Sequence, residues 1–598
     1  MKKSLFSLMV VLSLLLPLAA TKSFGAYDLG TKDMVTGAGV ATVAKPARSK
    51  TVNLTAPATL NQSDTEYVLQ NDIVANGTAF TIQGSNITLN LNGHKITYCN
   101  SNSSTAYGVF VDGSARSNVA VVNGKIVQGS GSCSGQSGVG VNCNPIYAYE
   151  TYGMEIGGVD ISYRAADTHG IYLQWGKDAN VHNNSVQDLG TAVSDRHQGI
   201  DAVRAGNVTN ATMHHNLVKT RQVGIRVGTG GTVYNNEVTI NSQVTNSVGI
   251  SLQTGSAHHN KVYGYGVHPI AFWPDHDSQV YSNYAEVQNT LSGAEYGDTG
   301  SACLRMTWGT GNNSEIMYNT FIVNASANYN GTGVDSWGRA LFVGLPDASQ
   351  SADIHDNVII ATNNDGQGKA AAIAIVTNNL SPNLKFRNNR VESNWANVLL
   401  ADDYGSADGY AQFIDNTFVK RDNYSSYKTV KSEYSSRPST GVFTGNTMEN
   451  GASMENVDLE LSGTGKKDIL VYWHLGVSVK NSAGAVLSGS AVSVKDSTGK
   501  VVYSGQTDAN GSITADVLQF EDSNLSGGSV VSREVKTVNT PHTITVSRDG
   551  LTATRSVTVN YRLEGSPGGL YRQGEVRGEL YLYNDPVLQR RACRSLLL

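Results

Sequence analysis

Side chains able to transfer protons or to neutralise charge gather in the middle of the chain, between residues 169 and 339. The candidates for a catalytic role are Asp201, Arg226, His268, Asp275 and Asp277. Two carboxylates can act as acid and base on a glycosidic bond when they lie about 5 to 9.5 Å apart, which would pair Asp201 with Asp275 or Asp277. Alternatively, an arginine fork can bind a uronate carboxylate while a neighbouring His, Arg or Tyr removes the C5 proton. These residue types therefore suit hydrolysis or β-elimination of an acidic polysaccharide.

A further set of side chains could hold a sugar without reacting with it. Pyranose rings carry apolar C–H faces that pack on tryptophan, and arginine binds carboxylates. The candidates for substrate binding are His169, His197, Arg204, Trp273, His276, Arg305, Trp308 and Trp337. Two structural alternatives stay open at this point. Asp201 and Arg226 could form an exposed ion pair that contributes under about 1 kcal/mol, and residues 273–277 could be an Asp-rich turn beside a packed Trp.

The sequence that surrounds these residues is repetitive, and each repeat starts at a Gly-Ile dipeptide. The dipeptide occurs at spacings of 29, 25 and 25 residues, at Gly170-Ile171, Gly199-Ile200, Gly224-Ile225 and Gly249-Ile250. A period of about 20 to 40 residues with short β-type runs indicates a solenoid, and no amphipathic helical pattern competes with it. We therefore expect a coiled array of strands.

The repeat predicts which side chains share a column. If each Ile points inward, the following residues point outward, which gives the column Tyr172, Asp201, Arg226 and Ser251, to which a coil at Leu304 adds Arg305. Two residues before each Ile lies a second column of His169, Gln198, Val223 and Val248, to which a coil at Ile270 adds His268. Asp201 and Arg226 are thus expected on adjacent coils.

Each repeat also reaches an Asn-x-apolar triplet. Ten such asparagines occur, at Asn184, Asn216, Asn236, Asn260, Asn283, Asn319, Asn357, Asn389, Asn416 and Asn446. Asn tolerates a left-handed backbone at a corner, and its amide can bond to the Asn of the next coil, so we predict a structural ladder. His214-His215 and His258-His259 precede two of these asparagines, where they would be exposed corner residues or, if stacked, metal ligands.

Gly-Ile strand starts, Asn corners and coils of variable length resemble the pectate-lyase-like superfamily, over roughly residues 50 to 450. The resemblance implies an all-β fold: a right-handed parallel β-helix solenoid followed by a small antiparallel β-sandwich. Lyases, hydrolases, epimerases, phage tailspikes and adhesins share this scaffold, so fold alone does not select an activity. Residues 273–277 loosely resemble the Asp-Pro-His-Asp motif of mannuronan C5-epimerases, but their order is Pro-Asp-His-Asp, and no role is transferred.

The regions outside the repeat complete the expected organisation. Residues 1–26 have a basic start, an apolar run and small residues at the end, which predicts a signal peptide and an exported protein, whether extracellular, on the cell surface or periplasmic. The other expected divisions are a leader or cap (27–50), the β-helix (51–456), a polar linker (457–467), a β-sandwich resembling carboxypeptidase-regulatory-like domains (468–561) and a tail (562–598) that is disordered or reflects an altered reading frame.

Composition narrows the function classes. A net charge of -5 argues against a nucleic-acid partner, and no later segment is apolar enough to cross a bilayer. Cys133 and Cys143 bracket a Gly/Ser-rich loop and could form a disulfide in an oxidising compartment. No cofactor is evident, although calcium could assist a lyase. Two functions remain: engagement of an extended polysaccharide, with or without cleavage, and a non-catalytic surface scaffold or adhesin; the oligomeric state is left open.

Overall fold

The computed structural model describes residues 40–559 and 575–582, with gaps at 134–142, 166–167, 192–197, 202–207, 243–246, 290–300, 307–312, 326–336, 346–348, 364–368, 376–382, 401–408, 423–425, 433–437 and 482. For residues 198–201, 337, 409 and 575–582 the description covers the backbone only. No helix in these ranges is long and apolar enough to cross a bilayer.

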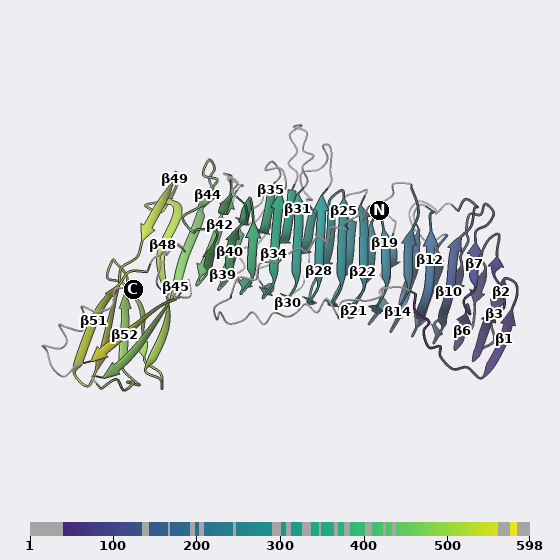
Figure 1. The fold of residues 1–598 in the computed structure, drawn as a ribbon, viewed down its shortest axis with the longest axis horizontal. Helices are drawn as coiled ribbons and strands as arrows, with labels where there is room; N and C mark the ends of the chain where they lie inside the picture. Colours follow the sequence, from purple (N-terminus) through teal and green to yellow (C-terminus); the bar gives the residue numbers. More distant parts are fainter. Residues whose placement is uncertain are drawn as a thin grey trace, which may run out of the picture.

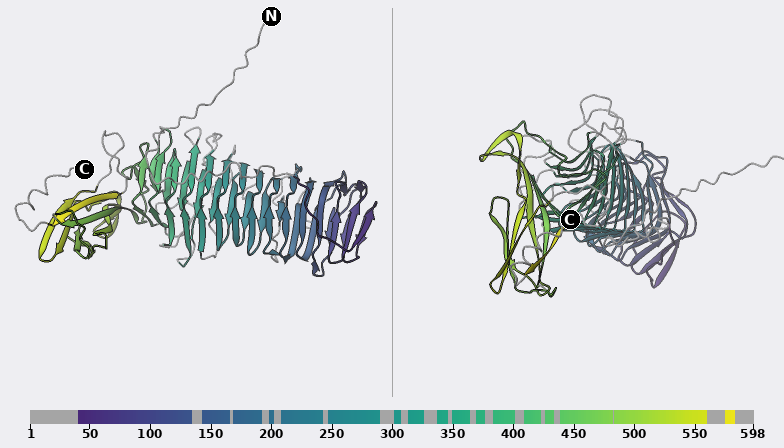
Figure 2. Two further views of the ribbon diagram at one scale, coloured as in Figure 1. Left: turned by 60° about the horizontal axis from the view of Figure 1, so that its bottom comes forward. Right: turned by 60° about the vertical axis from the view of Figure 1, so that its left-hand side comes forward.

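The chain winds into a long solenoid whose strands pair in parallel with those of the preceding and following coils (Figure 1). The strands form three stacks along the solenoid, and Figure 2 shows the stacks enclosing the interior of the coil. The fold is therefore the expected right-handed parallel β-helix.

Stack 1 carries the candidate site. It comprises β2(Ala58–Leu60), β5(Phe80–Ile82), β8(Val109–Val111), β11(Ile146–Tyr152), β13(His169–Lys177), β16(Gln198–Asp201), β20(Val223–Val227), β23(Ser247–Leu252), β26(Pro269–Pro274), β29(Ser301–Met306), β32(Trp337–Val343), β35(Lys369–Ile375), β38(Ala396–Leu400), β41(Lys428–Ser432) and β44(Val457–Leu459). Two short strands, β9(Arg116–Ser117) and β17(Val208–Thr209), pair with the C-terminal ends of β11 and β13, respectively.

Stacks 2 and 3 close the coil. Stack 2 comprises β1(Lys50–Leu54), β3(Thr65–Leu69), β6(Ile87–Asn90), β14(Asn180–His182), β18(Thr212–His214), β21(Gly231–Tyr234), β24(Gly255–His258), β27(Ser278–Tyr281), β30(Asn313–Met317), β33(Ser351–His355), β36(Leu384–Arg387), β39(Gly409–Ile414), β42(Ser439–Thr444) and the start of β45(Lys467–Asn481). Stack 3 comprises β4(Ile73–Val74), β7(Lys95–Tyr98), β15(Ser185–Asp188), β19(Leu217–Thr220), β22(Glu237–Ser242), β25(Lys261–Gly266), β28(Tyr284–Asn289), β31(Thr320–Ala325), β34(Val358–Asn363), β37(Arg390–Ser393), β40(Thr417–Lys420) and β43(Thr447–Glu449). Strands β10(Ala120–Gln128) and β12(Glu155–Tyr163) are long enough to run through both stacks.

One apolar core fills the solenoid. Inward residues of stack 1 lie above one another and are fully buried, as at Ile171, Ile225, Ile250, Phe272 and Leu304. Because each coil contacts mainly its neighbours, the core grows along the axis and not in width.

The predicted asparagine ladder is confirmed. Each of the ten ladder asparagines except the last donates its side-chain amide to the side-chain oxygen of the Asn in the next coil, at 2.9–3.1 Å. The left-handed backbone lies one residue earlier than expected, with φ of 53–63° at Asn183, His215, Asn235, His259, Ser282, Tyr318, Asp356, Asn388, Asp415 and Gly445. The preceding residue makes the turn, so that the ladder Asn can point inward and bond along the axis.

The C-terminal strands are mostly antiparallel. Strand β45 pairs in parallel with β42 over Lys467–Tyr472 and antiparallel with β48(Ser512–Ser526), which in turn pairs with β49(Ser529–Val538). A second sheet comprises β46(Ala491–Lys495), β47(Val501–Gln506), β50(His542–Arg548) and β51(Leu551–Val557). Side chains from both sheets share one apolar core; the carboxypeptidase-regulatory-like sandwich and the domain boundaries stay predictions. Within the predicted tail, β52(Glu575–Leu582) pairs with β45.

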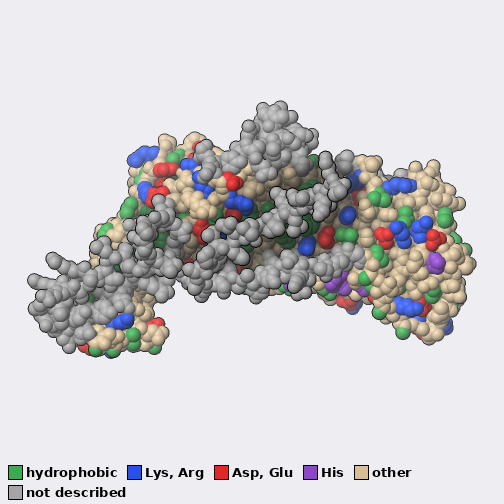
Figure 3. All heavy atoms as spheres, in the orientation of Figure 1, with side chains coloured by type: hydrophobic (Ala, Val, Ile, Leu, Met, Phe, Trp, Pro, Cys, Tyr) green, Lys and Arg blue, Asp and Glu red, His purple; other side chains and the backbone are tan. Residues whose placement is uncertain are grey.

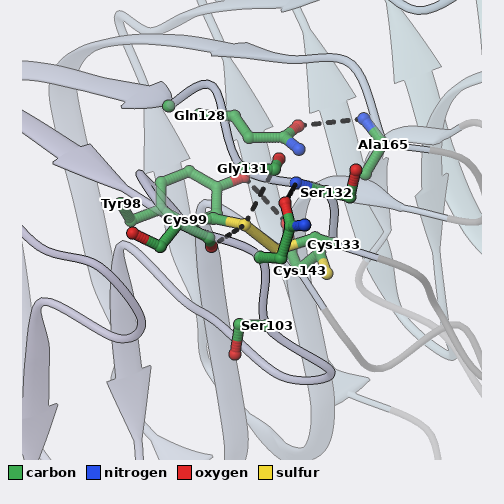
Figure 4. Close-up of a disulfide and its surroundings, with 12 residues drawn as sticks. Tyr98, Cys99, Ser103, Gln128, Gly131, Ser132, Cys133, Cys143 and Ala165 are labelled. Atoms are coloured by element: carbon green, nitrogen blue, oxygen red, sulfur yellow. Dashed lines mark hydrogen bonds between the residues drawn. A yellow bond between two sulfur atoms is a disulfide. The ribbon is translucent and has the colours of Figure 1, made fainter.

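The expected Cys133–Cys143 disulfide is wrong. Cys133 instead bonds to Cys99, with their Cα atoms 6.7 Å apart, and Cys143 is a buried free thiol (Figure 4). The reason is the coil geometry: Cys133 forms an isolated bridge with Ser103, which brings it against the preceding coil. Proximity in sequence was therefore a poor guide, because residues separated by one coil are closer than residues across the loop.

Candidate functional site

The outward column of stack 1 forms in the predicted register. Tyr172 pairs with Asp201, Asp201 with Arg226, and Arg226 with Ser251. Neighbouring parallel strands lie about 4.8 Å apart, so these positions are adjacent along the axis. The side chain of Arg226 is half-buried, whereas the description of Asp201 stops at its backbone. An acidic and a basic residue thus occupy adjacent coils, as expected from the sequence.

In the next coil the observed register differs from the predicted one, and the second column changes accordingly. Ile270 pairs with Val248, and Phe272 occupies the inward position opposite Ile250. Trp273 therefore joins the outward column opposite Ser251, and His268 falls outside the column to which it was assigned. The shift arises because Ala271 can fill the small position that Gly fills in the preceding coils.

Arg305 joins the outward column as predicted and lies between two aromatic rings. Its guanidinium carbon is 4.8 Å from the centre of the Trp273 ring and 5.7 Å from that of Phe342. Only 4% of Arg305 is exposed, and such desolvated cation–π contacts contribute about 2 kcal/mol. The contact orders Trp273 and Arg305 together, while a role in substrate binding stays a prediction for both.

His268 lies near a second buried arginine. Burial, followed by the charge of Arg339, lowers the pKa of His268 to about 4. Arg339 is fully buried, with its guanidinium carbon 4.6 Å from the centre of the Phe342 ring. His268 is therefore neutral at physiological pH, and its surroundings oppose protonation.

Asp275 and Asp277 follow the opposite end of β26 from His268. Seven residues of extended chain cover roughly 20 Å, so His268 and Asp275 are not brought to the same bond. Asp275 lies 3.3 Å from Nδ1 of His276, and Asp277 accepts a hydrogen bond of 3.1 Å from the backbone N–H of Asn313 in the next coil. With φ of 43° at Asp277, this segment forms the turn between β26 and β27 and is hydrogen-bonded to the next coil.

Several predicted residues lie beyond the described side chains. His197, Arg204 and Trp308 fall in gaps of the description, and Trp337 is described by its backbone, which pairs with Lys369. His169 is described, and 1% of it is exposed because it stacks on Tyr172 at 4.5 Å between ring centres.

An aromatic cluster continues the outward column toward the N-terminus and was missed from the sequence. The rings of Phe110, Tyr147 and Tyr172 lie on successive coils, with centres 5.5 and 5.2 Å apart, and Tyr107 packs against Phe110 and Tyr147. The Tyr147 hydroxyl donates a 2.9 Å hydrogen bond to the side-chain oxygen of Gln174. The cluster packs against Tyr149, which leads to an open depression.

The depression lies at the ends of β11 and β13 and has a volume of about 490 Å³. Its lining is rich in aromatic and charged side chains and comprises Tyr149, Glu150, Tyr152, Trp175, Gly176, Lys177 and Thr209. The ammonium group of Lys177 lies 5.8 Å from the centre of the Tyr152 ring. We call these seven residues the aromatic depression.

Two residues of the aromatic depression have an unusual backbone. Trp175 and Glu150 have φ of 61° and 54°, and the pairing of their flanking residues sets them side by side on adjacent coils. A left-handed backbone costs roughly 1–2 kcal/mol for residues other than Gly, Asn or Asp. Trp175 also leaves 40% of its surface exposed, so neither packing nor turn chemistry accounts for a tryptophan here.

Comparisons with known proteins add little beyond the fold. No protein-family model and no curated protein matches the chain. Among solved structures, the chain is similar to the tailspike protein of Escherichia coli bacteriophage HK620 in complex with a pentasaccharide, at 13% identity and a TM-score of 0.38, over 82% of this chain and 87% of that one. A single-residue variant of the same tailspike is 13% identical to this chain, with a TM-score of 0.39, over 82% of this chain and 87% of that one. At this level of similarity the tailspikes carry no information on what this chain binds.

Proposed function

We propose that this protein is exported and binds an extended polysaccharide, with the aromatic depression as its principal contact. The observation that carries the proposal is Trp175, which is 40% exposed in a left-handed conformation beside Glu150. Strained residues persist where the surrounding structure holds them, and they concentrate at ligand sites.

The chemistry of the lining suits a sugar. Tyr149, Tyr152 and Trp175 offer ring faces and edges to the apolar C–H faces of pyranose rings, while Glu150 and Lys177 can hydrogen-bond to hydroxyl or carboxylate groups. A volume of about 490 Å³ lies within the usual range of ligand sites.

The geometry supports binding better than cleavage. Among the described residues that line the aromatic depression, Glu150 is the one carboxylate, whereas glycoside hydrolysis by acid and base requires two. The pairing of Asp201 with Arg226, next to Tyr172, favours cleavage as a second candidate function. If Asp201 and Arg226 are not catalytic, the protein is a rigid adhesin that binds the polysaccharide without cleaving it.

Binding is tested with the full chain on a panel of neutral and acidic polysaccharides, by affinity electrophoresis and calorimetry. We expect Trp175→Ala to weaken binding at least about tenfold, which corresponds to about 1.4 kcal/mol. Tyr265→Ala is the matched control, because Tyr265 is an aromatic residue of similar exposure, 37%, on stack 3. Equal binding by both variants would refute the assignment of the site.

Cleavage is tested on the same panel by following unsaturated-uronate absorbance and reducing ends in parallel. A lyase gives both signals, whereas a hydrolase gives reducing ends alone. Either activity should then fall in Asp201→Asn and Arg226→Ala. Binding without either signal identifies the non-catalytic form.

A further inference from the structure

A second array of rings occupies the outer surface of stack 2, away from the aromatic depression. His182, His214, Tyr234, His258 and Tyr281 occupy equivalent positions in five successive coils. Their ring centres lie 4.9, 4.8, 5.2 and 4.7 Å apart, with interplanar angles of 6–13°. Figure 3 shows histidine side chains gathered on this lower edge of the solenoid, near the strands labelled β14 and β21 in Figure 1.

Two of these histidines are followed by a second histidine at the coil corner. His215 and His259 both have φ of 55°, which turns each ring across the edge of its predecessor at 85° and 88°. As a result, the Nδ1 atoms of His214 and His215 lie 2.8 Å apart, and those of His258 and His259 lie 2.9 Å apart. The same donor geometry thus occurs twice, two coils apart.

We propose that the pairs His214–His215 and His258–His259 are two equivalent sites for a divalent transition-metal ion that takes nitrogen donors in cis positions, such as Cu²⁺ or Ni²⁺. With metal–nitrogen bonds of about 2.0 Å, two donors at a right angle lie about 2.8 Å apart, whereas tetrahedral donors lie about 3.3 Å apart. The spacing in both pairs is that of an N–H···N hydrogen bond, and it also equals the spacing of the right-angled arrangement. Tetrahedral Zn²⁺ would require the two nitrogens to move apart as well.

The four rings are accessible to solvent. His214, His215 and His258 are partly exposed and His259 is exposed.

Binding requires a change of tautomer and no net loss of a proton. In a neutral pair whose Nδ1 atoms are in contact, one Nδ1 carries the hydrogen that the other accepts. Moving that hydrogen to Nε2 of the same ring frees both Nδ1 lone pairs, and rotation of the side chains then turns both lone pairs toward one metal ion. Nε2 of His215 lies 3.3 Å from the side-chain nitrogen of Asn235, and rotation of this amide would offer its oxygen to the new N–H group.

The two sites would hold separate ions. Tyr234 lies between His214 and His258 in the stack, and two coils separate the pairs by roughly 10 Å, well beyond the 3.5–4 Å of a two-metal centre. Each pair supplies two donors, and water would complete the coordination. No group of three or more His, Cys, Asp or Glu side chains in the described ranges is placed to hold a metal, so these sites differ from a closed structural centre.

The test uses full-length protein without a histidine tag, titrated with CuCl₂ and followed by calorimetry and electron paramagnetic resonance. The variants are His215→Asn and His259→Asn, because Asn occupies the same left-handed corner at Asn183 and Asn235 and should preserve the turn. We expect each variant to bind one ion fewer than the parent, and the double variant two fewer, since losing a ligand weakens a site at least about tenfold. The lost signal should be an axial Cu²⁺ spectrum with two nitrogen couplings.

His182→Ala is the matched control. His182 stacks on His214 but precedes Asn183, so this variant should keep the parental number of ions. Circular dichroism confirms that every variant is folded. Unchanged stoichiometry in both His→Asn variants, or an equal loss in His182→Ala, would overturn the proposal.

Discussion

Removing one amide from the centre of the asparagine ladder should destabilise the solenoid far more than removing one from its surface. The side-chain oxygen of Asn260 accepts hydrogen bonds of 3.0 Å from both the backbone and the side-chain nitrogen of Asn236. Its amide donates to the carbonyl of Val233 at 2.8 Å and to the side-chain oxygen of Asn283 at 3.0 Å. All three asparagines are fully buried, so water cannot replace the lost partners.

The magnitude follows from the groups left behind. Asn260→Ala removes the side-chain acceptor of the Asn236 backbone N–H and the side-chain donor to the Val233 carbonyl. A buried polar group without a partner costs about 1–3 kcal/mol, which gives a loss of about 2–6 kcal/mol. Asn241 lies on an exposed position of β22, so Asn241→Ala is the matched control, with an expected effect within about 0.5 kcal/mol.

Urea denaturation measures the loss, and hydrogen exchange locates it. Because coils contact mainly their neighbours, amide protection in Asn260→Ala should fall in β21, β24 and β27, while β36 and β39 keep theirs. A loss of stability no larger than that of Asn241→Ala would refute the reasoning. So would a uniform loss of protection along the whole solenoid.

Two further predictions concern titratable groups. Hydrogen bonds to Asp415 at 3.0 Å and Asp516 at 2.6 Å raise the pKa of His474 from 6.5 to about 10. The protonated His474 therefore stabilises the fold fully below pH 6.5, and this contribution is lost as the pH rises through about 10. The difference in unfolding free energy between the parent and His474→Gln should disappear at high pH. A difference that stays constant with pH would contradict this. Burial raises the pKa of the Cys143 thiol to about 12, so in native protein it should react with a disulfide reagent far more slowly than after unfolding, and peptide mapping without reductant should find Cys133 joined to Cys99.

The coil spacing was readable from the sequence because two kinds of position tolerate little change. The ladder Asn is the side chain that can both donate and accept along the axis, so it recurs in every coil. The Gly before the inward Ile recurs because a Cβ on Gly224 would lie 2.3 Å from Val238 and 2.5 Å from the Gly249 carbonyl.

The register at β26 was misassigned because that second position requires a small residue and not glycine as such. Ala271 precedes Phe272, Cys303 precedes Leu304, and this small-apolar pattern would have placed Trp273 in the outward column. The disulfide was predicted wrongly for a different reason: residues in contact on adjacent coils are far apart in the sequence.

The aromatic depression was missed because one of the two coils that line it, the coil of β11, lacks the Gly-Ile signal. Ile146 follows Pro145 but lies 25 residues before Ile171, and Tyr147 then aligns with Tyr172. That spacing could have revealed the aromatic column. The left-handed Trp175 could not have been predicted, because turn propensity places Gly or Asn at such a position.

Strand β45 has a consequence for how the solenoid ends. A parallel β-helix presents at its last coil a row of backbone groups that could pair with another chain, and such edges promote fibre growth. Here residues 467–472 of β45 take that edge of β42, and the same strand then turns its other edge to β48. One continuous strand thus covers the last edge of stack 2 and pairs on its far side with a strand of opposite polarity, so that this edge is not free to pair with another molecule.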